Sequence, residues 1–195
     1  MDWSACYQNG ETPWEKGAPH PALSSFLSSH QDLFANEPRI FHPGCGFGRD
    51  AAVLARVAES ITAIDIAVEP IAMAKQLHPA KNIRWEIGDL FTWPEEDCYD
   101  LVWEHTCISA IAPSTRSDYA RTIHQVLKPG GIFCGIIFLN PDHDPDQGPP
   151  FHISRAELYD MLDFGFDLLE DLPNPPTYEG REDRETLMIW RKRLS

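Results

Sequence analysis

A glycine-rich turn followed by an acidic residue constrains this chain more than any other feature. Gly44, Gly46 and Gly48 lie between an apolar stretch and a helix-forming stretch, and Asp65 follows about 20 residues later. A glycine turn between a strand and a helix lets a ligand approach the backbone. A carboxylate at the tip of the next strand can accept hydrogen bonds from two ribose hydroxyls. The pattern therefore predicts an adenosine-containing cofactor.

Strands and helices alternate along the chain, which predicts an α/β fold with a mostly parallel, seven-stranded sheet flanked by helices. We expect Pro70 in the first turn of its helix, and Lys128-Pro129-Gly130-Gly131 as the stop before the fifth strand. The expected strands are 39–42, 60–66, 82–87, 101–104, 132–139, 166–170 and 186–190, and the expected helices are 21–34, 50–57, 70–77, 117–127 and 154–162.

Length, charge and cysteine content limit the choice of partners. The 195 residues fit one domain over the whole range 1–195, and the net charge of −14 opposes binding to nucleic acid or an anionic membrane. No apolar run is long enough to span a bilayer. Five scattered cysteines without CxxC spacing indicate neither a disulfide framework nor a zinc site. These features favour a cytoplasmic protein with a small-molecule substrate, a monomer or weak dimer.

The glycine turn alone does not select the cofactor. Its G-x-G-x-G spacing is one residue short of the dinucleotide pattern, and a turn of this kind can be merely a tight connection. A second acidic residue, Asp89, follows the third strand, where its carboxylate can accept a hydrogen bond from an adenine amino group. Leu90 and Phe91 would then pack against the ring. The alternative for Asp89 is an ordinary acidic turn.

The N-terminal arm narrows the interpretation. Residues 3–17 read Trp-x6-Gly-x-Thr-Pro-Trp-x2-Gly, and this arm resembles the signature of the thiopurine S-methyltransferase family, with its thiol and halide methyltransferase branch. The likeness continues in order through the motifs around Gly44, Asp65 and Asp89, and then to the C-terminal segment 181–190. It implies a Rossmann-like class I methyltransferase that uses S-adenosylmethionine and releases S-adenosylhomocysteine.

The resemblance also implies roles for aromatic residues of the arm. Residues 1–34 would form a lid on the cofactor, with Trp3, Tyr7 and Trp14 beside the donor. Aromatic faces stabilise a sulfonium cation by roughly 0.5 to 2 kcal/mol each. The alternative is that these rings simply clamp the arm to the core.

Three residues are candidates for contact with the methyl acceptor. Arg116 carries a fixed charge that can favour an attacking anion, although a surface ion pair with Asp118 or Glu104 is an alternative. Glu104 and His105 lie where the family has an acidic and aromatic motif after the fourth strand. His105 replaces an aromatic residue beside the cofactor, so it either contacts the cofactor, assists proton removal or is a histidine satisfied by the backbone.

The loop from residue 140 to 150 contains hard ligands but matches no metal-site spacing, so we expect no metal and interpret the loop as a lid. Phe151 follows it where the plant halide and thiol branch tends to carry tyrosine. Without that hydroxyl a hydrogen-bond donor to a small anion is lost, which disfavours methylation of halide or thiocyanate.

The sequence thus predicts methyl transfer to a small soft nucleophile, most directly a thiol or thiopurine-like sulfur. The alternatives are a halide, thiocyanate or metalloid-oxyanion methyltransferase, a nicotinamide-dependent oxidoreductase, and a cofactor-binding sensor without catalysis. In-line displacement at a sulfonium methyl needs alignment rather than a metal or a covalent intermediate.

Overall fold

The computed structural model describes residues 1–139, 141, 143–144 and 147–194. The chain divides into two compact units, Met1–Trp93 and Pro94–Ser195. The assignment of residues 1–195 to a single domain stays a prediction.

Seven strands form a sheet in the order β3-β2-β1-β4-β5-β7-β6. The strands are β1 (Arg39–Pro43), β2 (Ser60–Asp65), β3 (Ile83–Ile87), β4 (Tyr99–His105), β5 (Leu127–Phe138), β6 (Phe166–Pro173) and β7 (Glu185–Lys192). The pairs β1–β2, β2–β3 and β4–β5 are parallel, whereas β7 is antiparallel to both β5 and β6. The predicted α/β, mostly parallel, seven-stranded fold is confirmed.

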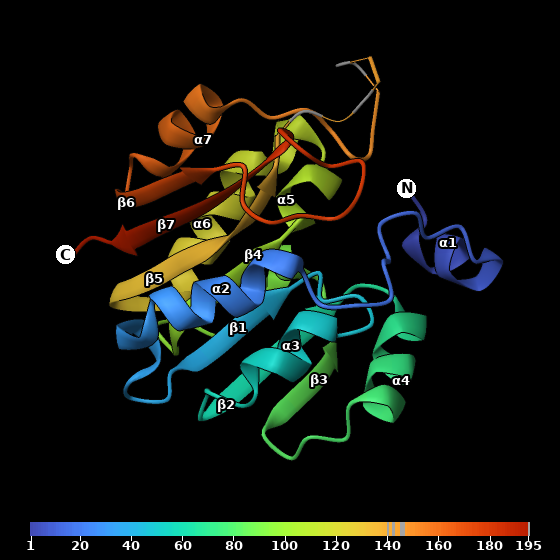
Figure 1. Ribbon diagram of the computed structural model, residues 1–195, viewed down its shortest axis with the longest axis horizontal. Helices are drawn as coiled ribbons and strands as arrows, with labels where there is room; N and C mark the ends of the chain where they lie inside the picture. Colours follow the sequence, from blue (N-terminus) through green and yellow to red (C-terminus); the bar gives the residue numbers. More distant parts are fainter. Residues whose placement is uncertain (140, 142, 145–146, 195) are drawn as a thin grey trace. The chain divides into compact units, whose positions relative to one another are not determined.

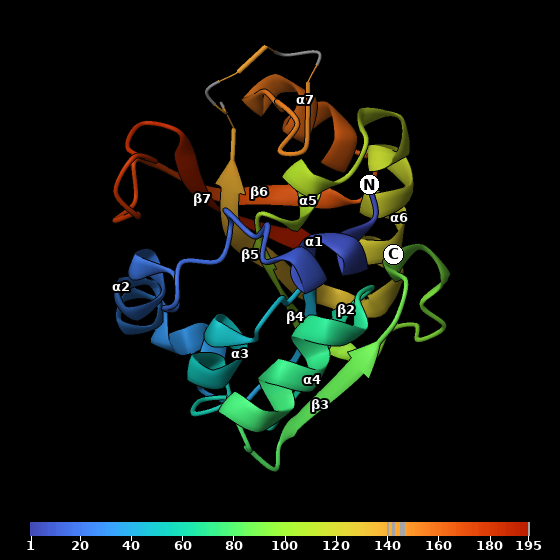
Figure 2. The same ribbon diagram turned by 90° about the vertical axis from the view of Figure 1, so that its right-hand side faces the viewer.

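In the first unit, helices pack beside the parallel strands β1 to β3 (Figure 1). Its helices are α1 (Trp3–Asn9), α2 (Pro21–Ser29), α3 (Arg49–Leu54) and α4 (Val68–Leu77), with 3-10 turns η1 (Gln31–Phe34) and η2 (Leu90–Thr92). Apolar residues on one side of each helix drive this packing: α3 buries Leu54, and α4 buries Ile71 and Ala74. Helix α1 lies against α4 (Figure 2).

The first unit differs from the sequence prediction mainly in its helices. The helix predicted over 50–57 spans Arg49–Leu54. Helix α1 was not predicted; it begins because Asp2 accepts a hydrogen bond from the amide of Ala5, 3.0 Å away, and ends at Gly10 in the left-handed region. The helix predicted over 21–34 is interrupted after Ser29, and a 3-10 turn follows. Helix α4 starts two residues before Pro70. Pro70 is therefore still in the first turn, where a helix tolerates proline.

In the second unit, helices accompany the strands β4 to β7 (Figure 1). They are α5 (Cys107–Ala110), α6 (Arg116–Val126) and α7 (Arg155–Leu162), with a 3-10 turn η3 (Pro113–Thr115). Helix α6 buries Tyr119, Ile123 and Val126 along one side. Ser154 caps α7 by accepting from the amide of Glu157 at 3.1 Å. The short helix α5 was not predicted from the sequence.

The stop predicted at Lys128-Pro129-Gly130-Gly131 is wrong in its details. Helix α6 does end just before it, but β5 begins at Leu127, and these four residues belong to that strand. The pairing with β4 shifts here, from Tyr99 opposite Leu127 to Leu101 opposite Ile132. A bulge of this kind accommodates residues that periodicity assigns to a turn.

In the part of the chain that the structure describes, no helix combines the length and the apolar character that a membrane crossing requires.

Candidate functional site

The glycine turn between β1 and α3 presents accessible backbone at its first two glycines. Gly44, Gly46 and Gly48 all have positive φ, at 58°, 52° and 72°. Gly44 is exposed and Gly46 is half-buried, whereas Gly48 is buried. A Cβ atom on Gly48 would lie 2.2 Å from Cη2 of Trp85. Solvent therefore reaches the first two glycines, and the third is required by packing inside the unit.

Asp65, the last residue of β2, lies directly against this turn. Its Oδ2 accepts a hydrogen bond from the amide of Gly46 at 3.0 Å, and its Oδ1 accepts from the amide of Ala67 at 3.0 Å. Burial raises the pKa of the Asp65 carboxyl. A carboxylate offers about four lone-pair positions, so two hydrogen bonds leave acceptor capacity for hydroxyls. The structure thus brings Asp65 and the glycine turn together, as the sequence predicts.

The three aromatic residues of the arm form one cluster with a residue of the glycine turn. Trp14 meets Trp3 and Tyr7 edge-on, with ring centroids 5.3 and 5.7 Å apart, and its Nε1 donates to the Tyr7 hydroxyl at 3.3 Å. Tyr7 packs on Phe47, whose centroid is 5.4 Å away. We call Trp3, Tyr7, Trp14 and Phe47 the aromatic cluster. Phe47 was not predicted, although its place between Gly46 and Gly48 was a usable signal.

Tyr7 connects the aromatic cluster to the backbone of the turn. Its hydroxyl lies 3.4 Å from the position that a Cβ on Gly46 would take. Burial, followed by the nearby charge of Asp65, raises the pKa of the Tyr7 phenol, so this group stays neutral at physiological pH.

Asp89 and Leu90 follow β3 at the edge where Asp65 ends β2. The amide of Gly88 donates to the carbonyl of Asp65 at 3.0 Å, which attaches this segment to β2. Asp89 caps the turn η2 by accepting from the amide of Phe91 at 2.9 Å. Leu90 is buried, whereas Asp89 and Phe91 are exposed. Every predicted cofactor residue except His105 therefore lies in the first unit.

Glu104, in the second unit, is fully buried and its oxygens have protein partners. The hydroxyl of Tyr119 donates to Oε2, and the amide of Ile108 donates to Oε1 at 3.0 Å. Burial raises the pKa of Glu104 to about 7. Tyr119 was not among the predicted site residues, although its position on the buried side of α6 was a signal for an inward contact.

His105 is half-buried, and its ring stacks on Tyr178 with centroids 6.4 Å apart and an angle of 17° between the planes. Tyr178 belongs to the loop between β6 and β7, 73 positions further along the chain. Sequence reasoning gave no signal for this pairing, because the two residues share no motif.

Arg116 is buried, and the alternative to its predicted acceptor contact, a surface ion pair with Asp118 or Glu104, is not the ion pair that it forms. Its Nη1 lies 2.6 Å from Oε1 of Glu157, and its Nη2 donates to the carbonyl of His152 at 2.7 Å. Asp118 pairs instead with Arg121 at 2.8 Å. The sequence offers no signal for this ion pair, because Glu157 lies 41 positions further along the chain. The contact of Arg116 with the acceptor stays a prediction.

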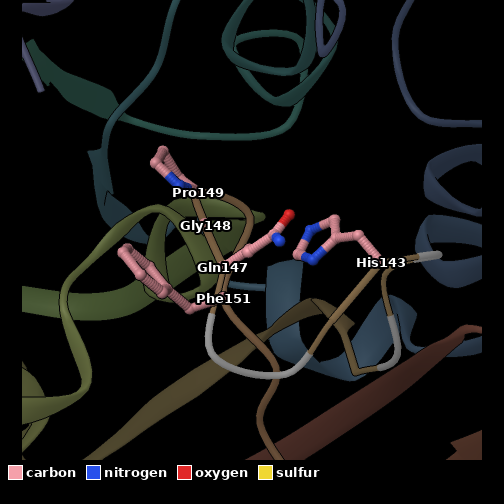
Figure 3. A pocket seen from close by; sticks show the side chains of 5 residues that line it. All are labelled: His143, Gln147, Gly148, Pro149 and Phe151. Carbon is pink, nitrogen blue, oxygen red and sulfur yellow. The ribbon is translucent and has the colours of Figure 1, made fainter.

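The loop before α7 contributes a pocket lined by His143, Gln147, Gly148, Pro149 and Phe151 (Figure 3). The ring of Phe151 packs on Gly148, so a Cβ atom on Gly148 would lie only 2.3 Å from Cδ1 of Phe151. Residues 140, 142, 145 and 146, which the sequence analysis included in a lid, lie outside the described residues. Among the residues with described positions, no group of three or more histidine, cysteine, aspartate or glutamate side chains could hold a metal ion.

The fold matches solved structures of S-adenosylmethionine-dependent methyltransferases. One is the 1,6-didemethyltoxoflavin-N1-methyltransferase of Burkholderia thailandensis, with bound S-adenosylhomocysteine: TM-score 0.75, 19% identity, covering 98% of this chain and 86% of that one. Another, an S-adenosylmethionine-dependent methyltransferase from Methanosarcina mazei, has a TM-score of 0.73 and 19% identity, covering 91% of this chain and 100% of that one. The fold is therefore that of a class I methyltransferase.

The family follows from the sequence comparison. The family model described as Thiopurine S-methyltransferase (TPMT) matches residues 1–172, and the chain belongs to this family. A thiocyanate methyltransferase of Brassica oleracea is 28% identical, with 97% of this chain and 84% of that protein covered. A thiopurine S-methyltransferase of Vibrio parahaemolyticus is 24% identical, with 82% and 80% covered. The predicted family and the predicted methyltransferase activity are confirmed.

Proposed function

We propose that this protein transfers the methyl group of S-adenosylmethionine to a small sulfur nucleophile, most directly a thiol. The observation that carries the proposal is the meeting of the glycine turn, Asp65 and the aromatic cluster within one compact unit. A carboxylate for a ribose, open backbone at Gly44 and Gly46, and aromatic faces for a cation are the groups that this donor needs.

The residues of the first unit fit the donor in chemical type. Asp65 would accept hydrogen bonds from the ribose hydroxyls with its remaining lone pairs. Asp89 would accept from the adenine amino group, and Leu90 would pack on the ring. Trp3, Tyr7 and Trp14 would exclude water and face the sulfonium, which supplies the electrophilic methyl group when the donor is bound.

The acceptor is proposed from its chemistry and from the relatives. A thiol of pKa about 8.5 is partly ionised near neutral pH, so alignment can replace a dedicated base. The relatives are named as thiocyanate, thiol and thiopurine methyltransferases, all of which act on sulfur compounds. Thiocyanate is the second candidate acceptor, because a thiocyanate methyltransferase is among the relatives that cover nearly the whole chain.

Roles for the second unit follow from its contacts. His105 is the proposed group for orienting the acceptor or removing its proton. Glu104 is a weaker candidate for a base, because its oxygens already accept from Tyr119 and Ile108. We now assign Arg116 an indirect role, in which it holds the segment at His152 through the carbonyl that it binds.

We also propose a cytoplasmic location. It is supported by the cysteines, since all five are free thiols, as a reducing compartment would keep them.

The test is incubation with methyl-labelled S-adenosylmethionine and a panel of thiols, thiopurines, thiocyanate, iodide and oxyanions of selenium or tellurium. We expect labelled thioethers, detected by mass, at a higher kcat/KM than any halide product. Methylation of iodide or thiocyanate alone would replace the thiol proposal. Absence of every methylated product despite S-adenosylhomocysteine binding would favour a sensor. Binding of a nicotinamide cofactor without S-adenosylhomocysteine would contradict the proposal itself.

A further inference from the structure

An ion pair joins the N-terminal arm to the helix that follows the glycine turn. Nε of Arg49 lies 3.2 Å from Oε1 of Glu15. Arg49 is the first residue of α3 and comes directly after Gly48, while Glu15 comes directly after Trp14. The ion pair therefore links the arm, next to Trp14, to the start of α3, next to Gly48.

Glu15 also shapes the arm itself. The same Oε1 atom accepts from the amide of Gly17 at 2.5 Å, and the backbone amide of Glu15 donates to the carbonyl of Thr12 at 3.0 Å. One carboxylate thus closes a turn of the arm and attaches that turn to α3.

The pair is better protected from solvent than most surface ion pairs. The side chains of Arg49 and Glu15 retain 29% and 18% of their exposure. Half-buried charges are screened less by water and salt than exposed ones. For comparison, the pair of Arg121 and Asp118 retains 63% on both sides.

Other contacts fix the two ends of the arm. On α1, the side-chain Nε2 of Gln8 donates to Oε1 of Glu69 on α4 at 2.5 Å. At the far end, the amide of His20 donates to Oδ1 of Asp50 at 2.8 Å. Between these ends, Glu15, which follows Trp14, forms the ion pair with Arg49. Loss of this attachment would leave Trp14 held by its ring contacts and by the hydrogen bond to Tyr7.

We infer that Glu15 and Arg49 are positioning residues that hold the aromatic cluster against the glycine turn and so slow the release of the methyl donor. The inference rests on the proposed function, because it takes the donor to bind beside that turn. Neither residue needs to touch the donor. The ion pair acts indirectly, because it fixes the positions of the Trp14 and Tyr7 side chains.

The experiment compares Glu15→Gln, Arg49→Gln and the double variant. Glu11→Gln serves as the matched control, since Glu11 is an exposed carboxylate of the same arm. Amide hydrogen exchange of residues 3–17 is measured without ligand, and dissociation of S-adenosylhomocysteine is followed by tryptophan fluorescence. Each single variant should speed arm exchange and ligand dissociation by about three- to tenfold, with kcat changed less than KM for the donor. The double variant should exceed neither single variant by more than about twofold, because the two residues form one interaction.

Arm exchange that is unchanged in Glu15→Gln and Arg49→Gln would overturn the inference, as would equal effects in Glu11→Gln or independent effects that multiply in the double variant. A wild-type protein that fails to bind S-adenosylhomocysteine would contradict the proposed function instead. In that case the exchange data still decide whether the ion pair holds the arm, although its link to donor release would be lost.

Discussion

Strands β2 and β4 both end near a buried carboxylate, and the two carboxylates have different kinds of neighbours. Asp65 accepts from backbone amides, one of which belongs to Gly46 in the accessible glycine turn. Glu104 accepts from the hydroxyl of Tyr119 and from the amide of Ile108, both in buried residues. Burial raises the pKa of both groups, so burial alone does not distinguish them.

Asp65 and Glu104 are both buried, so their hydrogen-bond partners indicate their roles better than their burial does. Asp65 fixes a loop in which Gly44 is exposed and Gly46 is half-buried, and the proposed ligand would bind beside this carboxylate. Glu104 links α5 and α6 to the end of β4 through these hydrogen bonds, so its role is structural.

The largest effect is expected for Glu104→Ala. The substitution leaves the hydroxyl of Tyr119 and the amide of Ile108 without their acceptor and opens a cavity, so stability should fall by about 3 to 5 kcal/mol. Urea unfolding at pH 5.5, where the folded carboxyl holds its proton, measures the loss. A loss below about 1 kcal/mol would remove the interior role of Glu104 and with it the contrast to Asp65.

The pH dependence of stability should also depend on Glu104. Its pKa is about 7 in the folded protein and 4.5 ordinarily. Between these values the folded state keeps a proton that the unfolded state has lost, so this carboxyl stabilises the protein at low pH. That contribution should be lost as the pH rises from 4.5 to 7, by about 3 kcal/mol. Unfolding of the wild type and of Glu104→Gln at pH 5 and pH 8 gives the difference; parallel pH profiles would contradict it.

Asp65→Ala should mainly affect ligand binding. Loss of a charge-assisted contact to the ribose should weaken the affinity for S-adenosylhomocysteine by about 1 to 3 kcal/mol, measured by calorimetry. Asp65→Asn is the companion variant, because it keeps one oxygen for the amide of Gly46. Normal affinity in Asp65→Ala with an intact fold would show that the ribose assignment is wrong.

The smallest effect is expected for Trp14→Ala, which should cost about 1 kcal/mol of donor affinity and lower turnover as well. The loss should be larger for S-adenosylmethionine than for S-adenosylhomocysteine, because only the former carries the sulfonium charge. Calorimetry with both ligands tests this. A loss of thermal stability with unchanged affinities would assign Trp14 to the packing of the arm alone.

The sequence predicted the parts of this protein that local patterns determine. Alternating apolar segments located all seven strands, and the motifs at Gly46 and Asp65 gave two groups that the structure brings within 3.0 Å. The family motif in the arm identified Trp3, Tyr7 and Trp14, which form one cluster.

What the sequence did not predict depends on short elements and distant partners. Helix α1 is only seven residues long and has no buried residue, so no apolar period marks it. Arg116 forms an ion pair with Glu157, and the ring of His105 stacks on Tyr178. Both contacts join residues far apart in the sequence, so they depend on tertiary packing. Residues of the second unit were therefore harder to assign than those of the first.

The contact between Gly48 and Trp85 has a consequence for how such a motif changes over evolution. Because the indole ring occupies the place of a side chain at position 48, the two positions are under a shared steric constraint. We expect homologues with a smaller residue at 85 to tolerate asparagine at 48, which accepts a positive φ, without losing the donor. The residue at position 48 would then vary together with the residue at position 85 on β3, because the two pack against each other. Such paired variation would reflect packing inside the unit and not contact with a ligand.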